Sequence, residues 1–155
     1  MKKNAVLIAL ALLAAPVPLG AQDAPGAIHV VEGQGCECCA KWTEYLQEQG
    51  FEVTSEERFG MLLIQHKIAQ GVPARLYSCH TAQIDGYFLE GHVPAEDIRR
   101  LLDERPDAAG LAVAGMPYGS PGMGPQASRE AYEVLLVRKD GSSEVFTRYP
   151  AGDGV

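Results

Sequence analysis

The sequence predicts one α/β domain with a long glycine- and proline-rich loop and a C-terminal β-hairpin. Three observations lead to this class. Short β-branched runs alternate with stretches at helical spacing as far as Pro106, residues 110–124 are mostly loop-forming, and residues 132–149 hold two extended runs around a turn. A chain of 155 residues without an internal repeat fits a single domain.

Residues 1–21 have the three-part layout of a secretory signal peptide. Two lysines precede an uncharged run, and small residues follow it. The alternative, an uncleaved membrane anchor, needs about 20 apolar residues, and Pro16 interrupts this run too early. We therefore expect a periplasmic or otherwise exported protein, with residues 22–155 as its single domain and no membrane association after cleavage.

The charge of the chain bears on its partners. Loss of Lys2 and Lys3 with the signal peptide moves the formal charge from −7 to −9. Nucleic acids and anionic lipids bind through Lys and Arg, so the composition argues against both as the main partner. It is compatible with the handling of cations.

The first expected elements surround three cysteines. The β-branched run over 28–31 predicts a strand, and a turn with Gly33 and Gly35 follows it. Apolar side chains at helical spacing, Trp42 and Tyr45 among them, predict a helix over 39–49, so the cysteines open this helix. We expect both aromatic residues to pack behind the cysteine turn.

Further elements follow as far as Pro106. A strand is expected over 51–54, and a helix over 59–70 with Met61 in the core and an apolar side turned inward, formed by Leu62, Leu63, Ile64 and Ile68. Extended runs are expected around 76–78 and over 84–89, broken near Asp85-Gly86. A third helix over 94–105 places Ile98, Leu101 and Leu102 inward.

The segment 110–124 is predicted to be a long loop, and loops of this length are usually functional or disordered. Met116 and Met123 lie seven positions apart within it. They fit a flexible thioether arm as well as they fit gap-filling side chains. The chain is then predicted to close with a hairpin of strands 132–137 and 144–149.

Cys36, Cys38 and Cys39 fall within four positions, and Cys36 and Cys39 form a Cys-x-x-Cys pair. At a helix N-terminus the exposed amides and the macrodipole favour a thiolate, which makes such a pair a good nucleophile or ligand. Three readings remain open. The pair is a reactive thiol site, it is a Cys36–Cys39 disulfide or a set of small buried cysteines, or the cysteines staple a structural module. If Cys38 does not share a helical face with Cys36 or Cys39, a disulfide to Cys79 is an alternative role for it.

Copper(I) prefers thiolate and thioether ligands. Zinc ranks lower, because three cysteines within four positions make an awkward tetrahedral clamp. We expect Cys36 and Cys39 as the principal ligands, with Cys79 or a methionine completing the site. The candidate metal ligands are Cys36, Cys38, Cys39, Cys79, His80, Met116 and Met123.

Three other histidines are weaker candidates. His92 stands at the entry to the third expected helix, where a capping or loop contact is the favoured role and ligation is the alternative. His29 and His66 show no partner pattern and are expected to be structural or solvent-facing.

The order of elements before Pro106, with a Cys-x-x-Cys pair opening the first helix, resembles the thioredoxin-like fold. This resemblance implies a three-layer arrangement around a central mixed sheet. It also implies that Pro73, after the second helix, is a candidate for a cis proline packed against the cysteine pair, although most such bonds are trans.

A closer resemblance covers nearly the whole chain after residue 21. The segments that carry it are Cys36-Glu37-Cys38-Cys39 with Trp42, Gly71-Val72-Pro73, Ser78 to Ala82, Gly86-Tyr87, Glu90 to Ala95, Gly115-Met116-Pro117 and Gly119 to Met123. They look like the bacterial family domain of unknown function 411, whose members are described as exported metal-binding or copper-related proteins. Glu37 and Ala114 depart from the expected glycine and proline.

The leading hypothesis is an exported protein that sequesters or transfers copper(I) without catalytic turnover, and that exchanges copper with a donor or acceptor protein. The rival hypothesis is a periplasmic thiol-disulfide oxidoreductase that uses Cys36 and Cys39.

Overall fold

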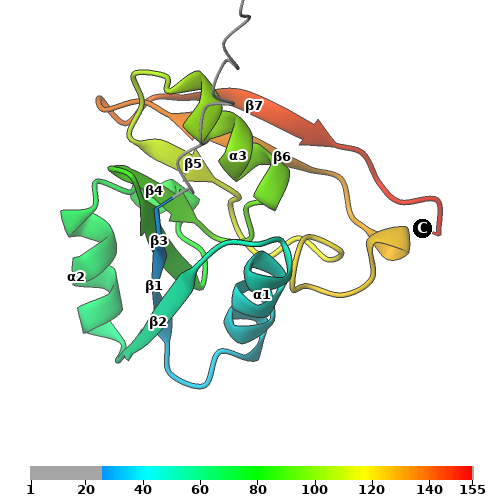
Figure 1. Ribbon diagram of the computed structural model, residues 1–155, viewed down its shortest axis with the longest axis horizontal. Helices are drawn as coiled ribbons and strands as arrows, with labels where there is room; N and C mark the ends of the chain where they lie inside the picture. Colours follow the sequence, from blue (N-terminus) through cyan, green and yellow to red (C-terminus); the bar gives the residue numbers. More distant parts are fainter. Residues whose placement is uncertain (1–25, 155) are drawn as a thin grey trace, which may run out of the picture.

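The computed structural model describes residues 26–154 (Figure 1). Within them, seven strands form one mixed sheet in the order β2-β1-β3-β4-β5-β6-β7. The pairs β1/β2 and β4/β5 are parallel, and the other neighbours are antiparallel. The elements are β1 (Ile28–Gly33), α1 (Glu37–Glu48), β2 (Val53–Arg58), α2 (Met61–Ala69), β3 (His80–Ile84), β4 (Tyr87–Glu90), α3 (Ala95–Glu104), β5 (Gly110–Ala112), β6 (Tyr132–Val137) and β7 (Ser143–Tyr149). The predicted α/β class, mixed sheet and C-terminal hairpin are confirmed.

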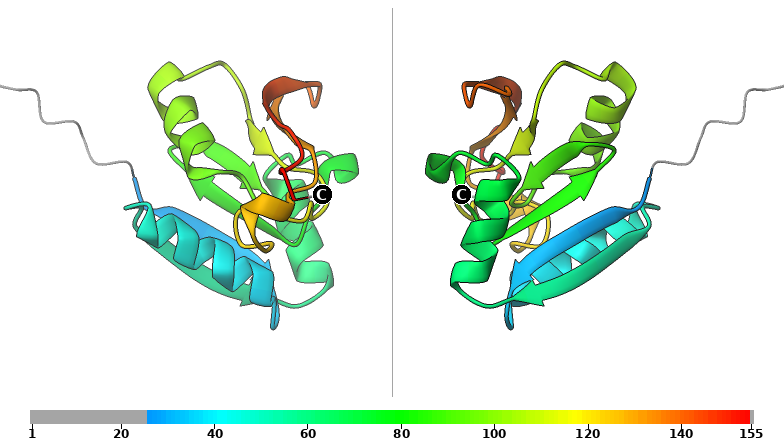
Figure 2. Two further views of the ribbon diagram at one scale, coloured as in Figure 1. Left: turned by 90° about the vertical axis from the view of Figure 1, so that its right-hand side faces the viewer. Right: turned by 90° about the vertical axis from the view of Figure 1, so that its left-hand side faces the viewer.

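Helices α1 and α3 share one face of the sheet, and α2 lies against the other (Figure 2). Trp42 and Leu46 of α1 and Ile98 of α3 are buried in one cluster with inward side chains of β1 and β4. A smaller apolar cluster, which includes Phe88 of β4, forms separately. Because neighbouring side chains along a strand point to opposite faces, Leu89 and Phe88 serve different layers.

Helix α2 contradicts the prediction that its apolar side faces inward. Its buried side chains are His66 and Lys67. The predicted core residue Met61 is 66% exposed, and Leu62, Ile64 and Ile68 are also exposed. The predicted helix is present, but the side that it turns toward the sheet is not the predicted one. The sheet-facing side carries Lys67, which pairs with a buried carboxylate on β4.

Two strand predictions also need correction. The run around 76–78 is not a strand; a short 3-10 helix, Ala74–Leu76, occupies it, and β3 begins at His80. Strand β5 lies within the segment predicted as loop, where three residues pair with β4 and β6. A strand of three residues is too short to show an alternating pattern in the sequence, and its pairing with β4 and β6 is what makes it a strand.

The peptide bond before Pro73 is trans, so the cis candidate is wrong. Pro73 instead adopts φ −65° and ψ 132° at the start of the 3-10 helix.

The interpretation of residues 1–21 as a signal peptide falls outside the described residues. Among residues 26–154, the structure contains no helix with the length and apolar character needed to cross a membrane.

Candidate metal centre

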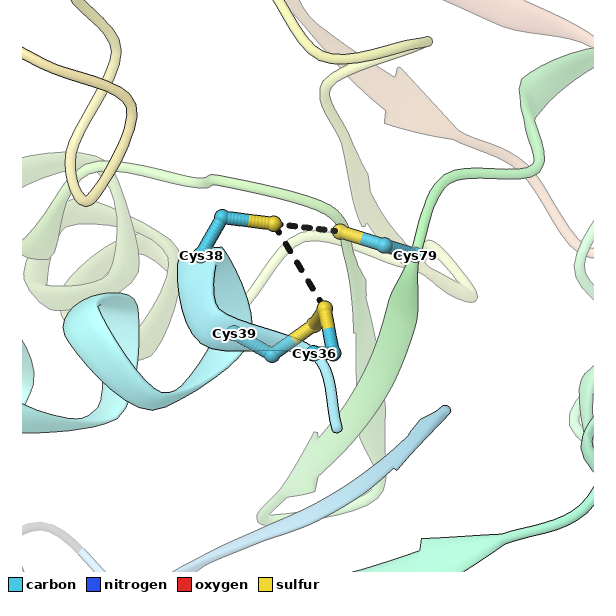
Figure 3. A group of neighbouring side chains, drawn as sticks. All are labelled: Cys36, Cys38, Cys39 and Cys79. Atoms are coloured by element: carbon cyan, nitrogen blue, oxygen red, sulfur yellow. Dashed lines mark hydrogen bonds between the residues drawn. A yellow bond between two sulfur atoms is a disulfide. The ribbon is translucent and has the colours of Figure 1, made fainter. Parts of the chain in front are cut away.

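Four sulfur atoms meet where β1 ends and α1 begins (Figure 3). The chain leaves β1 through Gly35, whose φ of +68° suits glycine, and Cys36 is the N-cap of α1. The Sγ atom of Cys38 lies 3.5 Å from that of Cys36 and 3.8 Å from that of Cys79. All four sulfurs lie within 4.8 Å of one another, the spacing of a group that could hold a metal ion.

Cys36 and Cys39 form a disulfide in this structure. The disulfide reading of the Cys-x-x-Cys pair therefore describes the oxidised state of the site. Cys38 and Cys79 carry free thiols and are not bonded to each other, so the suggested Cys38–Cys79 disulfide is absent from the part of the chain described here. Reduction of the Cys36–Cys39 disulfide would therefore give four free thiols at the site.

Cys79 reaches the cluster through the pairing of strands. Strand β3 runs antiparallel to β1, with His80 opposite Glu32. The start of β3 therefore lies beside the end of β1, and Cys79, one residue before β3, comes to lie next to the cysteines of α1.

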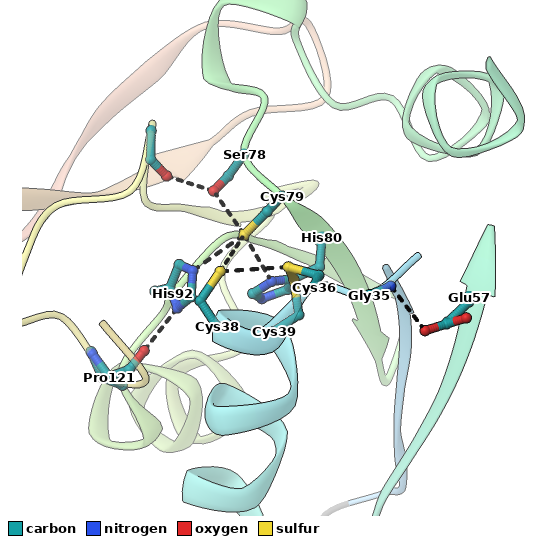
Figure 4. The surroundings of a disulfide bond; sticks show 11 residues. Gly35, Cys36, Cys38, Cys39, Glu57, Ser78, Cys79, His80, His92 and Pro121 are labelled. Atoms are coloured by element: carbon teal, nitrogen blue, oxygen red, sulfur yellow. Dashed lines mark hydrogen bonds between the residues drawn. A yellow bond between two sulfur atoms is a disulfide. The ribbon is translucent and has the colours of Figure 1, made fainter. Parts of the chain in front are cut away.

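His92, for which the sequence favours a capping or loop contact over metal ligation, lies beside Cys79 (Figure 4). Its Nδ1 lies 2.8 Å from the carbonyl oxygen of Pro121, to which Nδ1–H donates. The lone pair of Nε2 is then left on the side of Cys79, whose Sγ is 3.2 Å away. The contact to Pro121 is the loop contact expected of His92, and it is also the kind of contact that orients metal-binding histidines.

A sequence signal for His92 did exist. The β3–β4 hairpin returns the chain to its starting end, so the residue before β3 and the residues after β4 must lie close together. Cys79 and His92 hold these two positions.

His80 is fully buried, with its ring 4.3 Å from that of Trp42. Its Nδ1 lies 3.5 Å from the Sγ of Cys79, and its Nε2 has no hydrogen-bond partner within residues 26–154. Burial lowers the pKa of both His80 and His92. Both rings are therefore neutral at pH 7, which is the form that binds metals. Cys79, His80 and His92 make up a second group with metal-binding spacing.

The two methionines of the long loop lie in different places. Met123 lines an open hollow of about 580 Å³ together with Cys36, Cys38 and Tyr118. Met116 is 55% exposed and lines a separate hollow beside β6. The structure therefore brings Met123, rather than Met116, to the cysteines.

Gly122 fixes the long loop against α1. A Cβ atom at this position would lie 2.8 Å from the backbone nitrogen of Trp42 and 2.9 Å from the carbonyl oxygen of Cys38. Only glycine permits such close contact together with its φ of +81°. The loop therefore covers the cysteine turn and carries both Met123 and the Pro121 carbonyl that orients His92.

Burial raises the pKa of the Cys79 thiol to about 11, and the neighbouring Cys38 adds to this effect. Cys79 is therefore protonated at neutral pH until a cation displaces the proton.

This raised pKa predicts that the affinity for any cation bound at Cys79 depends on pH. Below pH 11 each cation bound at Cys79 releases a proton, so affinity should rise with pH, by up to about tenfold per unit for this thiol. Competition titrations of the reduced protein at several pH values between 6 and 8 measure the slope. In Cys79→Ser the slope should fall by one proton, and an unchanged slope would contradict the assignment.

The fold and the cluster define an α/β protein with a cysteine- and histidine-rich site of metal-binding geometry. A family model described as protein of unknown function, DUF411, matches residues 76–123, which include Cys79, His80, His92 and Met123. The chain belongs to the DUF411 family. The search of curated proteins finds no match.

Two solved structures of copper resistance protein CopG are similar to this chain. Form 1 is 44% identical, with a TM-score of 0.76, and the match covers 82% of this chain and 99% of that one. Form 2 is also 44% identical, with a TM-score of 0.73 and coverage of 80% and 98%. Together with the cysteine cluster, this similarity indicates copper-related metal binding.

Proposed function

We propose that the protein is an exported copper(I)-binding protein that sequesters or transfers copper through its cysteine cluster. The observation that carries this proposal is the meeting of four sulfurs from two distant segments, all within 4.8 Å. The relationship to copper resistance proteins supports it.

The chemistry of the donors favours copper(I) over zinc. Thiolate and thioether are soft ligands, and copper(I) accepts the low coordination numbers that two or three of them provide. Cys36 and Cys39 can bind only after their disulfide has been reduced by a dithiol, which passes two electrons and two protons to the pair and is itself oxidised to a disulfide, because a disulfide offers no thiolate. A redox change at this pair would therefore change the number of sulfur ligands from two, Cys38 and Cys79, to four.

The proposed ligands fall into three groups. The four cysteines form the primary set. His80 and His92 flank Cys79 as neutral imidazoles, and Met123 faces the same hollow as Cys36 and Cys38. Met116, on the exposed part of the loop, is assigned the role of a thioether arm that meets copper during exchange with a donor or acceptor protein.

A titration tests this proposal. The reduced protein is titrated with copper(I) against a competing chelator, alongside the Cys36→Ser/Cys39→Ser variant. We expect tight binding by the parent and a loss of at least the roughly 10–100-fold typical of a lost outer-shell contact in the variant. Met61→Ser, which removes an exposed thioether on α2, is the matched control and should bind as the parent does. Binding unchanged by the double serine replacement would disprove the site assignment.

A thiol-disulfide oxidoreductase is the second candidate, and the Cys36–Cys39 disulfide at the start of α1 favours it. Cys38, 3.5 Å from the Sγ of Cys36, would compete in every exchange step. Turnover of a model disulfide substrate at enzymatic rates in the absence of metal would support this candidate over copper binding.

A further inference from the structure

Helix α2 places a charged side chain, Lys67, against the sheet. Lys67 is 2% exposed, whereas Ile64 and Ile68 on the outer side of the same helix are exposed. A buried ammonium group is costly unless a partner compensates it. An apolar residue at position 67 would attach the helix at lower cost, so the lysine serves a purpose beyond packing.

The partner is Glu90, the last residue of β4, whose side chain is fully buried. One of its oxygens accepts from Lys67 Nζ at 2.6 Å and from the backbone N–H of Ser78 at 2.5 Å. The other accepts from Thr81 Oγ1 at 2.5 Å, and Lys67 Nζ also donates to Thr81 Oγ1 at 2.9 Å. Every donor that meets this carboxylate comes from α2 or from the segment that carries Cys79.

Ser78 directly precedes Cys79, and Thr81 follows two residues later. The carboxylate therefore accepts a backbone hydrogen bond just before Cys79 and a side-chain hydrogen bond two residues after it. Ser78 Oγ also donates to the carbonyl oxygen of Gly115 at 2.5 Å, which joins the same segment to the long loop. Directional hydrogen bonds of this kind fix a backbone position, which apolar packing alone does not.

We propose that Glu90 and Lys67 are positioning residues that hold Cys79 within reach of Cys38 and so assemble the four-sulfur cluster. Within residues 26–154, neither side chain makes a hydrogen bond to a cysteine sulfur. They act through the backbone of Ser78 and through Thr81. The consequence for copper rests on the proposed function, whereas the placement of the thiol does not.

Disulfide trapping tests the placement without copper. In the full chain with Cys36→Ser/Cys39→Ser, Cys38 and Cys79 are the remaining cysteines. Diamide takes two hydrogens from the two thiols and is reduced to the hydrazine, and intact mass follows disulfide formation over time. Lys67→Met/Glu90→Leu should slow trapping about tenfold or more, because the thiols lose their fixed approach. Glu90→Gln keeps an acceptor for the Ser78 N–H, so its trapping rate should lie between those of the parent and the double variant.

A matched control separates positioning from general stability. Asp97 of α3 is a similarly buried carboxyl that accepts hydrogen bonds from Thr147 and Tyr149 of β7 instead of from the Cys79 segment. Asp97→Asn should lower the melting temperature yet trap at the parent rate. The proposal is overturned if Lys67→Met/Glu90→Leu traps as fast as the parent, or if Asp97→Asn slows trapping equally for an equal loss of melting temperature. Should the double variant fail to fold, the trapping rates of Glu90→Gln and Thr81→Val are compared with those of the parent and Asp97→Asn instead, and trapping as fast as the parent by both overturns the proposal.

The four-cysteine protein extends the test to copper(I). Glu90→Gln should weaken copper(I) binding while Asp97→Asn leaves it unchanged, and equal affinity in the Glu90→Gln variant and the parent counts against the proposal. A parent that binds no copper(I) would overturn the proposed function, and the trapping rates would still decide the positioning role.

Discussion

Replacement of Cys79 by serine is expected to weaken copper(I) binding by more than the roughly 10–100-fold that loss of an outer-shell contact costs. Cys79 supplies the one sulfur of the cluster that does not belong to the α1 turn, 3.8 Å from Cys38 and 3.2 Å from His92 Nε2. Without it, the remaining three cysteines all belong to the turn at residues 36–39, and no sulfur approaches a cation from β3. A hydroxyl is a poor ligand for a soft cation.

The measurement is a competition titration of the reduced variant with copper(I), with circular dichroism to verify the fold. Met61→Ser again serves as the sulfur-loss control on the exposed side of α2. Copper(I) affinity and stoichiometry equal to the parent would remove Cys79 from the site. A parallel loss in the control would point to an effect unrelated to the cluster.

Truncation of Trp42 to alanine is expected to lower the free energy of unfolding by about 3–5 kcal/mol. The side chain is fully buried between the sheet and the cysteine turn, and its ring lies 4.3 Å from that of His80. Its Nε1–H donates to the carbonyl oxygen of Val93 at 2.9 Å. Truncation would leave a cavity and a buried carbonyl group without its donor.

Urea unfolding of the oxidised protein measures this loss from the midpoint and slope of the transition. Trp42→Phe is the control, because it keeps one aromatic ring and loses the indole N–H and part of the ring volume, so it should lower the free energy of unfolding by less than Trp42→Ala does. A Trp42→Ala variant within about 0.5 kcal/mol of the parent, as for a surface position, would contradict this role for Trp42.

Local pattern predicted most of the elements around the site. The β-branched run before Gly33 became β1, and the apolar spacing of Trp42 and Leu46 became the buried side of α1. The cysteines open α1 as predicted, although the helix begins at Glu37 rather than at Cys39 and Cys36 is its N-cap. The hairpin of β6 and β7 was likewise evident from two extended runs around a turn.

Long-range contacts explain where prediction failed. Helix α2 has helical spacing, but its inward face depends on Glu90, which lies 23 residues after Lys67 in the sequence. Strand β5 exists because β4 and β6 provide partners for three residues. The loop contact expected of His92 is present, but its short distance to Cys79 depends on the β3–β4 hairpin and on the loop that contains Pro121.

The sequence by itself determined the α/β class, the cysteine-bearing start of α1 and the donor types available to a thiophilic cation, because each of these depends on neighbouring residues. The tertiary structure decided which donors meet. Antiparallel pairing of β3 with β1 brought Cys79 to the α1 turn, and close contact of Gly122 with α1 brought Met123 there and left Met116 outside. Pairing and contact between distant segments depend on the burial and hydrogen bonding of the whole chain, which no local spacing records.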